Sequence, residues 1–222
     1  MTAAPGPGQD QGRFITLEGI EGSGKSSLAR WLAEQLAQRG RTLRLTREPG
    51  GTPLAERVRQ VVLARGEEPV PPAAELLLMF AARSIHVDNL IRPALARGEW
   101  IVCDRFTDAS RAYQGSGRGV PAQTIEALAE VAHPGLQPDL TLLLDVDPAL
   151  GLQRARGRGE GGDRFEDETL AFFARVRQGY LNLAARDPQR WRVIDAGQPQ
   201  QHVQAQALQQ LLQALPSGSP SP

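Results

Sequence analysis

The stretch Gly19-Ile20-Glu21-Gly22-Ser23-Gly24-Lys25-Ser26 decides the fold of this 222-residue chain. It fits the pattern G-x-x-x-x-G-K-[ST] of a phosphate-binding loop. The apolar run Phe14-Ile15-Thr16-Leu17 before it predicts a strand, and the run Ser27-Leu28-Ala29-Arg30-Trp31-Leu32 after it predicts a helix. Glycines let backbone N–H groups turn inward around an anion, and the helix N-terminus adds partial positive charge.

This loop predicts a site for a nucleoside triphosphate. Lys25 supplies a cation for the β- and γ-phosphates, and the Ser26 hydroxyl is a ligand for Mg²⁺. The residues expected to hold the nucleotide are Gly19, Ile20, Glu21, Gly22, Ser23, Gly24, Lys25, Ser26 and Ser27.

Short apolar runs alternate with helical patterns along the rest of the chain. Runs such as Leu142-Leu143-Leu144 are apolar throughout, which is typical of strands buried on both faces of a parallel sheet. We therefore expect an α/β fold of the P-loop NTPase type, with nucleotide and substrate at the carboxyl ends of the strands. The expected strands are 13–18, 42–46, 100–104, 140–146 and 192–194. The expected helices are 25–39, 53–64, 73–84, 86–97, 122–131, 149–156, 167–186 and 200–215.

Composition predicts one globular domain over residues 13–215, with disordered tails at 1–12 and 216–222. The formal net charge is zero, which argues against binding to nucleic acid or to anionic lipid. No apolar run approaches the ~20 residues that span a bilayer. Cys103 is the single cysteine and lies in an apolar run, so we expect a packed thiol in a reducing, cytoplasmic compartment.

Charged residues follow two of the predicted strands. Asp104 and Arg105 end the strand at 100–104, where an aspartate can hold Mg²⁺ through water and an arginine can bind a substrate phosphate. The alternative is a surface ion pair of little energetic value. Arg47 precedes the Pro49-Gly50-Gly51 turn after the preceding strand, and it is a second candidate phosphate ligand.

Two further groups of residues are candidates for substrate contacts. Met79, Phe80 and Arg83 share one side of a predicted helix, where an aromatic ring could stack on a base and the arginine could bind its phosphate. The alternative is a core phenylalanine and a solvated arginine. Tyr113 and Gln114 could contact sugar and base. The histidines at 86, 133 and 202 show no metal-ligand spacing, so no role is predicted for them.

A glycine-rich segment at about 154–166 contains four arginines, namely Arg154, Arg156, Arg158 and Arg164. Glycines permit movement, and arginines at this density repel one another unless an anion binds. The segment predicts a mobile lid that closes over the triphosphate and supplies an arginine to the transition state. A basic loop that binds nucleic acid and a solvated loop are the alternatives.

Together, these motifs resemble the bacterial thymidylate kinases, a family of P-loop nucleoside monophosphate kinases. The resemblance extends from about residue 13 to residue 200. It depends on six motifs in order: Glu18–Ser26, Thr46–Thr52, Asp104-Arg105-Phe106, Ala112-Tyr113-Gln114-Gly115, Pro138–Thr141 with Leu144-Asp145, and Asp163-Arg164-Phe165-Glu166. It implies a five-stranded parallel core, a homodimer, and transfer of a phosphoryl group from Mg-ATP to dTMP.

The resemblance also implies roles for individual residues. Glu21 would lie near the dTMP sugar and the metal, and Glu166 matches a position near the metal. Arg156 or Arg158 would complete the γ-phosphate site, because the loop carries a carboxylate and not a basic residue. Arg47, Arg83 and Arg105 would hold the monophosphate, and Ser110, Tyr113 and Gln114 would contact base and sugar, with Tyr113 favouring deoxyribose.

The chain departs from the family pattern at the base. The family usually places a stacking phenylalanine four residues before the pocket arginine, which is the position of Met79 here, while Phe80 is three residues before Arg83. Either side chain could face the base. Ser110 stands where an asparagine or threonine is frequent.

Other functions remain as alternatives. A different nucleoside monophosphate kinase or a deoxynucleoside kinase would share the loop, although a nucleoside offers no phosphate for three arginines. A GTP-dependent switch would carry an Asn-Lys-x-Asp motif, which is absent, since Lys25 is the single lysine of the chain. A nucleic-acid-dependent ATPase is disfavoured by the zero net charge.

Overall fold

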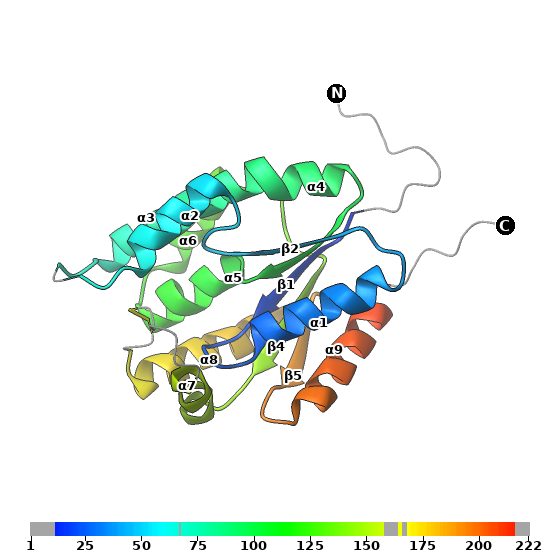
Figure 1. The fold of residues 1–222 in the computed structure, drawn as a ribbon. Helices are drawn as coiled ribbons and strands as arrows, with labels where there is room; N and C mark the ends of the chain where they lie inside the picture. The colour runs from blue at the N-terminus through cyan, green and yellow to red at the C-terminus, as the bar shows by residue number, and fades with distance from the viewer. Residues whose placement is uncertain (1–11, 67, 158–163, 166–167, 216–222) are drawn as a thin grey trace.

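One parallel sheet forms the centre of the protein. The computed structural model describes residues 12–66, 68–157, 164–165 and 168–215 (Figure 1). Five strands in these ranges pair in the order β2-β3-β1-β4-β5. They are β1 (Phe14–Glu18), β2 (Leu43–Arg47), β3 (Trp100–Asp104), β4 (Leu140–Asp145) and β5 (Trp191–Asp195). The α/β fold with a five-stranded parallel sheet is confirmed, and every expected strand is present with its ends shifted by one residue at most.

Helical segments connect the strands. They are α1 (Lys25–Ala37), α2 (Pro53–Leu63), α3 (Pro72–His86), η1 (Val87–Ile91), α4 (Arg92–Ala96), α5 (Thr107–Ser110), η2 (Arg111–Gly117), α6 (Ala122–Ala132), α7 (Pro148–Arg156), α8 (Leu170–Arg186) and α9 (Gln200–Ala214). Both η segments are π-helical. In the described part of the chain, no helix has the length and apolar character needed to cross a membrane.

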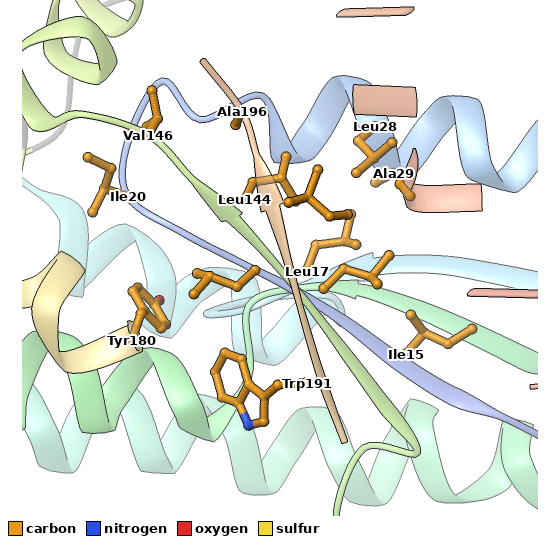
Figure 2. Close-up of a cluster of buried hydrophobic side chains, with 14 of the residues drawn as sticks. Ile15, Leu17, Ile20, Leu28, Ala29, Leu144, Val146, Tyr180, Trp191 and Ala196 are labelled. Atoms are coloured by element: carbon orange, nitrogen blue, oxygen red, sulfur yellow. The ribbon is translucent and has the colours of Figure 1, made fainter. Parts of the chain in front are cut away.

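The sheet is covered on both faces, as its apolar strands predicted. Ile15 and Leu17 of β1 pack in one cluster with Leu28 and Leu32 of α1 (Figure 2). Phe14 belongs to a second cluster with residues of η1 and α4. Because successive side chains of a strand point to opposite faces, α1 and α4 lie on opposite sides of the sheet. Helix α9 contacts α1, and Figure 1 shows the two side by side.

The register of the sheet brings the ends of three strands together. Leu17 of β1 is opposite Asp104 of β3 and also opposite Leu142 of β4. The loop after β1 therefore lies between the residues that follow β3 and those that follow β4, which is the usual ligand-binding edge of a parallel sheet.

The helix expected at 73–84 and the one expected at 86–97 are a single continuous helical path. It passes from α3 through the π-helical turn η1 into α4, and the N–H of Arg92 donates to the carbonyl of Val87, five residues back. Pro93 follows directly and has no N–H to donate. The wider turn accommodates this loss, because a proline ring inside a regular α-helix clashes with the carbonyl four residues earlier.

Residues 107–117 are helical, although no helix was expected there. Gly115 and Gly117 lower the intrinsic helix propensity of this segment. Tertiary packing explains the difference. A Cβ on Gly117 would lie 2.6 Å from the Phe172 ring, and one on Gly179 would lie 2.4 Å from Ser116 Oγ. The two glycines therefore allow η2 and α8 to approach closely, and this contact places the side chains of η2 beside the ligand-binding edge.

Candidate functional site

The loop after β1 has the geometry of a phosphate cradle. Gly19, Gly22 and Gly24 have φ values of 139°, 71° and 94°, which side-chain-bearing residues rarely adopt. A Cβ on Gly22 would lie 1.9 Å from the carbonyl oxygen of Gly151 in α7. Gly24 is the N-cap of α1 and contributes no side-chain hydrogen bond. The first N–H groups of α1 are thus available to an anion.

Lys25 is buried against this loop. Its Nζ donates to the carbonyls of Gly19 and Ile20 at 2.9 and 2.8 Å and to Ser23 Oγ at 3.3 Å. Burial lowers the pKa of Lys25 to about 8, and the charge of Arg105 acts in the same direction. The ammonium is therefore held where a polyanion would stabilise its charged form.

Two oxygen donors lie next to Lys25. The Ser26 hydroxyl donates to Asp104 Oδ2 at 2.9 Å, which joins the start of α1 to the end of β3. Hydroxyl and carboxylate oxygens suit Mg²⁺, whose remaining ligands are commonly phosphates and water. Within the described ranges, no group of three or more histidine, cysteine, aspartate or glutamate side chains could hold a metal by itself. Glu166, the third expected metal residue, lies outside the described residues.

Arg105 connects the phosphate loop with η2 and α8. Its Nη2 donates to Glu21 Oε1 at 2.9 Å and to the Tyr113 hydroxyl at 3.0 Å, and its Nη1 donates to the Tyr180 hydroxyl at 3.3 Å. The Tyr113 hydroxyl in turn donates to Glu21 Oε2 at 2.6 Å. Arg105 has a φ of 73°, and a non-glycine residue keeps such a conformation only when its surroundings enforce it.

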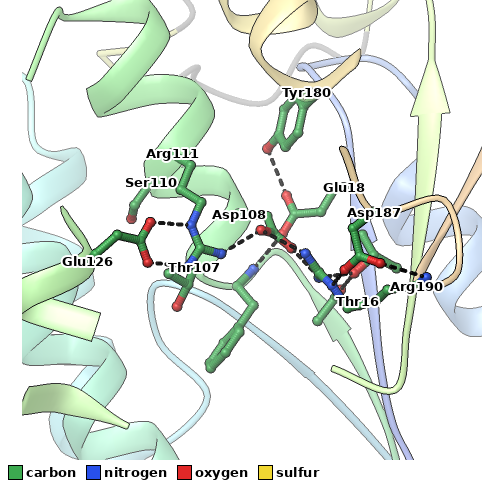
Figure 3. A network of polar contacts seen from close by, with 12 residues as sticks. Thr16, Glu18, Thr107, Asp108, Ser110, Arg111, Glu126, Tyr180, Asp187 and Arg190 are labelled. Carbon is green, nitrogen blue, oxygen red and sulfur yellow. Dashed lines mark hydrogen bonds and ion pairs between the residues drawn. The ribbon is translucent and has the colours of Figure 1, made fainter. Parts of the chain in front are cut away.

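Glu18 is one of the residues that hold this segment (Figure 3). Its Oε1 accepts the N–H of Phe106 at 2.8 Å, and its Oε2 accepts the Tyr180 hydroxyl at 2.7 Å. Burial raises the pKa of Glu18 to about 8, and the nearby charge of Asp108 adds to the shift. The sequence analysis assigned no role to Glu18 or Tyr180, because they lie 162 residues apart.

Asp108 fixes the start of the helical segment that follows Arg105 (Figure 3). This buried carboxylate accepts from Arg111 at 2.7 Å and from Arg190 at 2.6 Å. Arg190 also donates to Thr141 of β4 at 2.9 Å. The network anchors α5 to the sheet by charge-assisted hydrogen bonds.

Arg83 is buried between α3 and the end of β2. Its guanidinium donates to Glu48 at 2.7 Å, to Ser110 at 3.2 Å and to the carbonyl of Phe106 at 3.1 Å. Glu48 also contacts His86 at 3.0 Å, which gives this histidine a structural partner. Burial alone would raise the pKa of Glu48, but the charges and hydrogen bonds of Arg83 and His86 outweigh it and the net shift is downward.

A cavity opens beside these residues. Met79 lines the cavity, whereas Phe80 does not and packs in a buried cluster with Leu76 and Ile125. The expected substrate residues Arg83, Arg105, Ser110, Tyr113 and Gln114 are all in its wall, together with Glu21, Glu48, Pro49, Arg59, Leu63, Ala109 and Phe165.

A second cavity adjoins the first on the side of the phosphate loop. Lys25, Ser26, Asp104 and Arg47 line it, and Arg47 also pairs with Glu56 at 3.1 Å. Glu21, Glu48, Arg59 and Arg105 line both cavities. Arg59 was missed in the sequence analysis. It lies on α2, about two turns of helix beyond Thr52, the last residue of the nearest motif, and its Nη1 donates to the carbonyl of Pro49 at 2.8 Å.

A third cavity lies on the far side of the phosphate loop. Ser27 and Arg154 line it with residues of the segment after β5, and Arg154 donates to the carbonyl of Ala196 at 2.7 Å. Arg156 is exposed in the last turn of α7. Arg158 lies outside the described residues, as do 159–163 of the expected lid and nearly all of both expected tails.

The chain is similar to known thymidylate kinases. A family model described as thymidylate kinase matches residues 17–207. A thymidylate kinase of Alkalilimnicola ehrlichii is 58% identical over 189 residues, which are 85% of this chain and 87% of that protein. A thymidylate kinase of Teredinibacter turnerae is 52% identical over 204 residues, which are 92% of this chain and 98% of that protein. The crystal structure of thymidylate kinase from Ehrlichia chaffeensis has a TM-score of 0.74 and 32% identity, and the match covers 90% of this chain and 98% of that one.

The raised pKa of Glu18 predicts a pH dependence of stability. Between about 4.5 and about 8 the folded state binds a proton that the unfolded state releases, so stability falls as the pH rises through this window. In Glu18→Gln this contribution is absent. The free energy of unfolding of the wild type, relative to that of the variant, should decrease by up to about 1.4 kcal/mol per pH unit. Urea unfolding at pH 5.5, 7.0 and 8.5 measures this difference, and parallel pH profiles of the two proteins would contradict it.

Proposed function

The chain belongs to the thymidylate kinase family, and we propose that the two adjoining cavities carry out phosphoryl transfer from ATP to dTMP. The products are ADP and dTDP, a step toward dTTP for DNA replication. One observation carries the assignment of the site: the cavity of the phosphate loop and the cavity of Tyr113 and Gln114 share Glu21 and Arg105 in their walls. A donor and an acceptor phosphate bound in these cavities would meet at Arg105.

The reaction requires positioning more than proton transfer. An oxygen of the dTMP phosphate forms a bond to the γ-phosphorus while the bond to the β-γ bridging oxygen breaks. The acceptor oxygen is already ionised, so repulsion between two polyanions is the main barrier. We assign Lys25 to the β- and γ-phosphates and Arg105 to the acceptor phosphate and the transferring group, because fixed cations stabilise charge that is spread over these oxygens.

Arginines from four other segments complete the phosphate contacts in this proposal. Arg47 and Arg83 hold the monophosphate together with Arg105, and Arg59 is added to the expected set because it lines both cavities. An arginine of the lid, Arg156 or Arg158, closes on the γ-phosphate and excludes water.

The metal assignment follows from the donor set. Ser26 and Asp104 would hold Mg²⁺ beside the phosphate loop, with Glu166 near it as the resemblance implies. The ion would neutralise charge on the phosphate oxygens when bound. Ser26 and Asp104 already contact each other at 2.9 Å, which supports a shared ligand site.

The remaining cavity residues are assigned to the nucleoside. Ser110 and Gln114 contact the base, and Met79 lies against it, since Phe80 does not line the cavity. Tyr113 is assigned to the sugar, where its ring would crowd a 2′-hydroxyl and so favour deoxyribose. Its hydroxyl donates to Glu21 at 2.6 Å, which supports a fixed position for the ring. Homodimer formation and a cytoplasmic location stay predictions of the sequence analysis.

The acceptor preference tests this function. ADP release should be measured with Mg-ATP and equal concentrations of dTMP, dUMP, UMP, CMP, AMP, GMP or thymidine. We expect strong preference for dTMP. Preference for another monophosphate would agree with the arginines as phosphate ligands but would contradict the residues assigned to the thymine base. Release with thymidine alone, or without any acceptor, would overturn the proposal.

Substitution of Arg105 tests its assignment. Arg105→Ala should reduce turnover well over tenfold, because removal of one fixed donor to transition-state charge commonly costs ~100-fold or more. Arg39→Ala is the matched control, since Arg39 is an exposed arginine at the end of α1. Circular dichroism establishes that both variants are folded. Near-normal turnover of folded Arg105→Ala would exclude Arg105 from the mechanism.

A further inference from the structure

Glu75 is a buried carboxylate that the proposed reaction does not use. It lies in the first turn of α3, its side chain is 1% exposed, and it does not line the substrate cavity. Its Oε1 accepts a hydrogen bond from Gln114 Nε2 at 2.8 Å. Burying a carboxylate is costly unless it is paired, so its partners indicate what it does.

The second oxygen of Glu75 is occupied by two arginines. Arg164 Nη1 donates to Oε2 at 2.7 Å, and Arg118 Nη2 donates to it at 3.3 Å. Arg118 also reaches Oε1, to which its Nε donates at 3.4 Å. Arg118 is also paired with Glu168 at 2.5 Å. Guanidinium groups are donors only, so they require an acceptor at this oxygen. The two arginines supply the opposite charge that Glu75 needs in its buried position.

This arrangement fixes which way the amide of Gln114 points. Gln114 lines the substrate cavity and is 2% exposed. A carboxylate accepts hydrogen bonds and does not donate them, so the NH₂ of Gln114 must face Glu75. The amide oxygen is then the polar atom that Gln114 offers to a ligand. A base that meets it needs an N–H, such as the N3–H of thymine or uracil, whereas N3 of cytosine is itself an acceptor.

We propose that Glu75 is a positioning residue that fixes the amide of Gln114 and thereby makes the cavity select a base that donates from N3. This inference rests on the proposed function and extends it, because it assigns base selectivity to a residue outside the cavity wall. Arg118 and Arg164 take part by holding the other oxygen of Glu75.

The variant Glu75→Gln is expected to reverse the orientation of the Gln114 amide. Arg164, which makes the shortest arginine contact to Glu75, keeps the carbonyl oxygen of the new glutamine on its side, so the new NH₂ takes the position of Oε1 and faces Gln114. Two NH₂ groups do not hydrogen-bond to each other, and Gln114 is expected to turn its amide over. It then presents an NH₂ to the cavity, which favours a base with an acceptor at N3 and disfavours thymine.

The experiment compares kcat/KM for dTMP and dCMP in the wild type, in Glu75→Gln and in Glu168→Gln. Glu168→Gln is the matched control, because it removes a carboxylate from Arg118 without touching Gln114. The ratio of kcat/KM for dTMP to that for dCMP should fall at least about tenfold in Glu75→Gln. The turned amide of Gln114 would face N3–H of thymine with an NH₂ group, and two donors form no hydrogen bond. In the control the ratio should stay within about twofold, because Glu75 keeps both of its oxygens as acceptors and the amide of Gln114 keeps its orientation.

The ratio separates positioning from a general structural effect. A loss of structure alone lowers kcat/KM for both acceptors alike, so an unchanged ratio in Glu75→Gln would overturn the inference. Absence of dTMP activity in the wild type would instead refute the proposed function.

A second measurement covers the case in which Glu75→Gln does not fold. In the wild type, the side-chain NH₂ protons of Gln114 should exchange slowly with solvent by nuclear magnetic resonance, because they face Glu75 and not the cavity. Exchange as fast as that of the exposed Gln201 would overturn the inference.

Discussion

Burial of positive charge at the carboxyl end of β1 is the constraint on which the rest of the site depends. Lys25 and Arg83 are buried and the Arg105 side chain is 17% exposed. Burial lowers the pKa of Lys25, and the charge of Arg105 adds to this shift. Buried cations are tolerated only when acceptors surround them. Arg105 is bonded to Glu21, Arg83 to Glu48, and Lys25 to loop carbonyls. The arrangement holds cations in place before phosphates bind, so little reorganisation is needed when they do.

Buried carboxyl groups also join the elements of the fold. Glu18 belongs to β1 and holds the backbone after β3, Glu48 joins the end of β2 to α3, and Glu75 joins α3 to η2. Each bridges segments that are distant in the sequence, and the charge-assisted hydrogen bonds of Glu48 and Glu75 fix orientation as well as adding energy. The positive φ of Arg105 is maintained by such contacts on both sides of the residue.

The fold and the phosphate loop could be predicted from the sequence because their signals are local. A phosphate-binding loop between a strand and a helix requires glycine, lysine and serine or threonine at fixed spacing, and this chain has them in Gly19–Ser26. Apolar runs indicate the buried strands. The helical segment at 107–117 could not be predicted, since its glycines serve a contact with α8 that no local pattern reveals. The partners of Arg83 and Arg105 were missed for the same reason. Glu48 is 35 residues from Arg83 in the sequence, and Tyr180 is 75 residues from Arg105. Most of the residues that the motifs marked for the substrate line one cavity, whereas Arg47 lines the adjoining cavity and Phe80 lines neither. Their individual roles stay predictions.

The central claim is that the buried cations are arranged for the phosphate of the acceptor, and the affinities of dTMP and thymidine test it most directly. Isothermal titration calorimetry of the wild type with each ligand isolates the contribution of the 5′-phosphate. Charge-assisted hydrogen bonds contribute roughly 1.5–3 kcal/mol each, so dTMP should bind about 100-fold more tightly than thymidine or better. Equal affinities would show that the arginines do not hold the phosphate and would contradict the account.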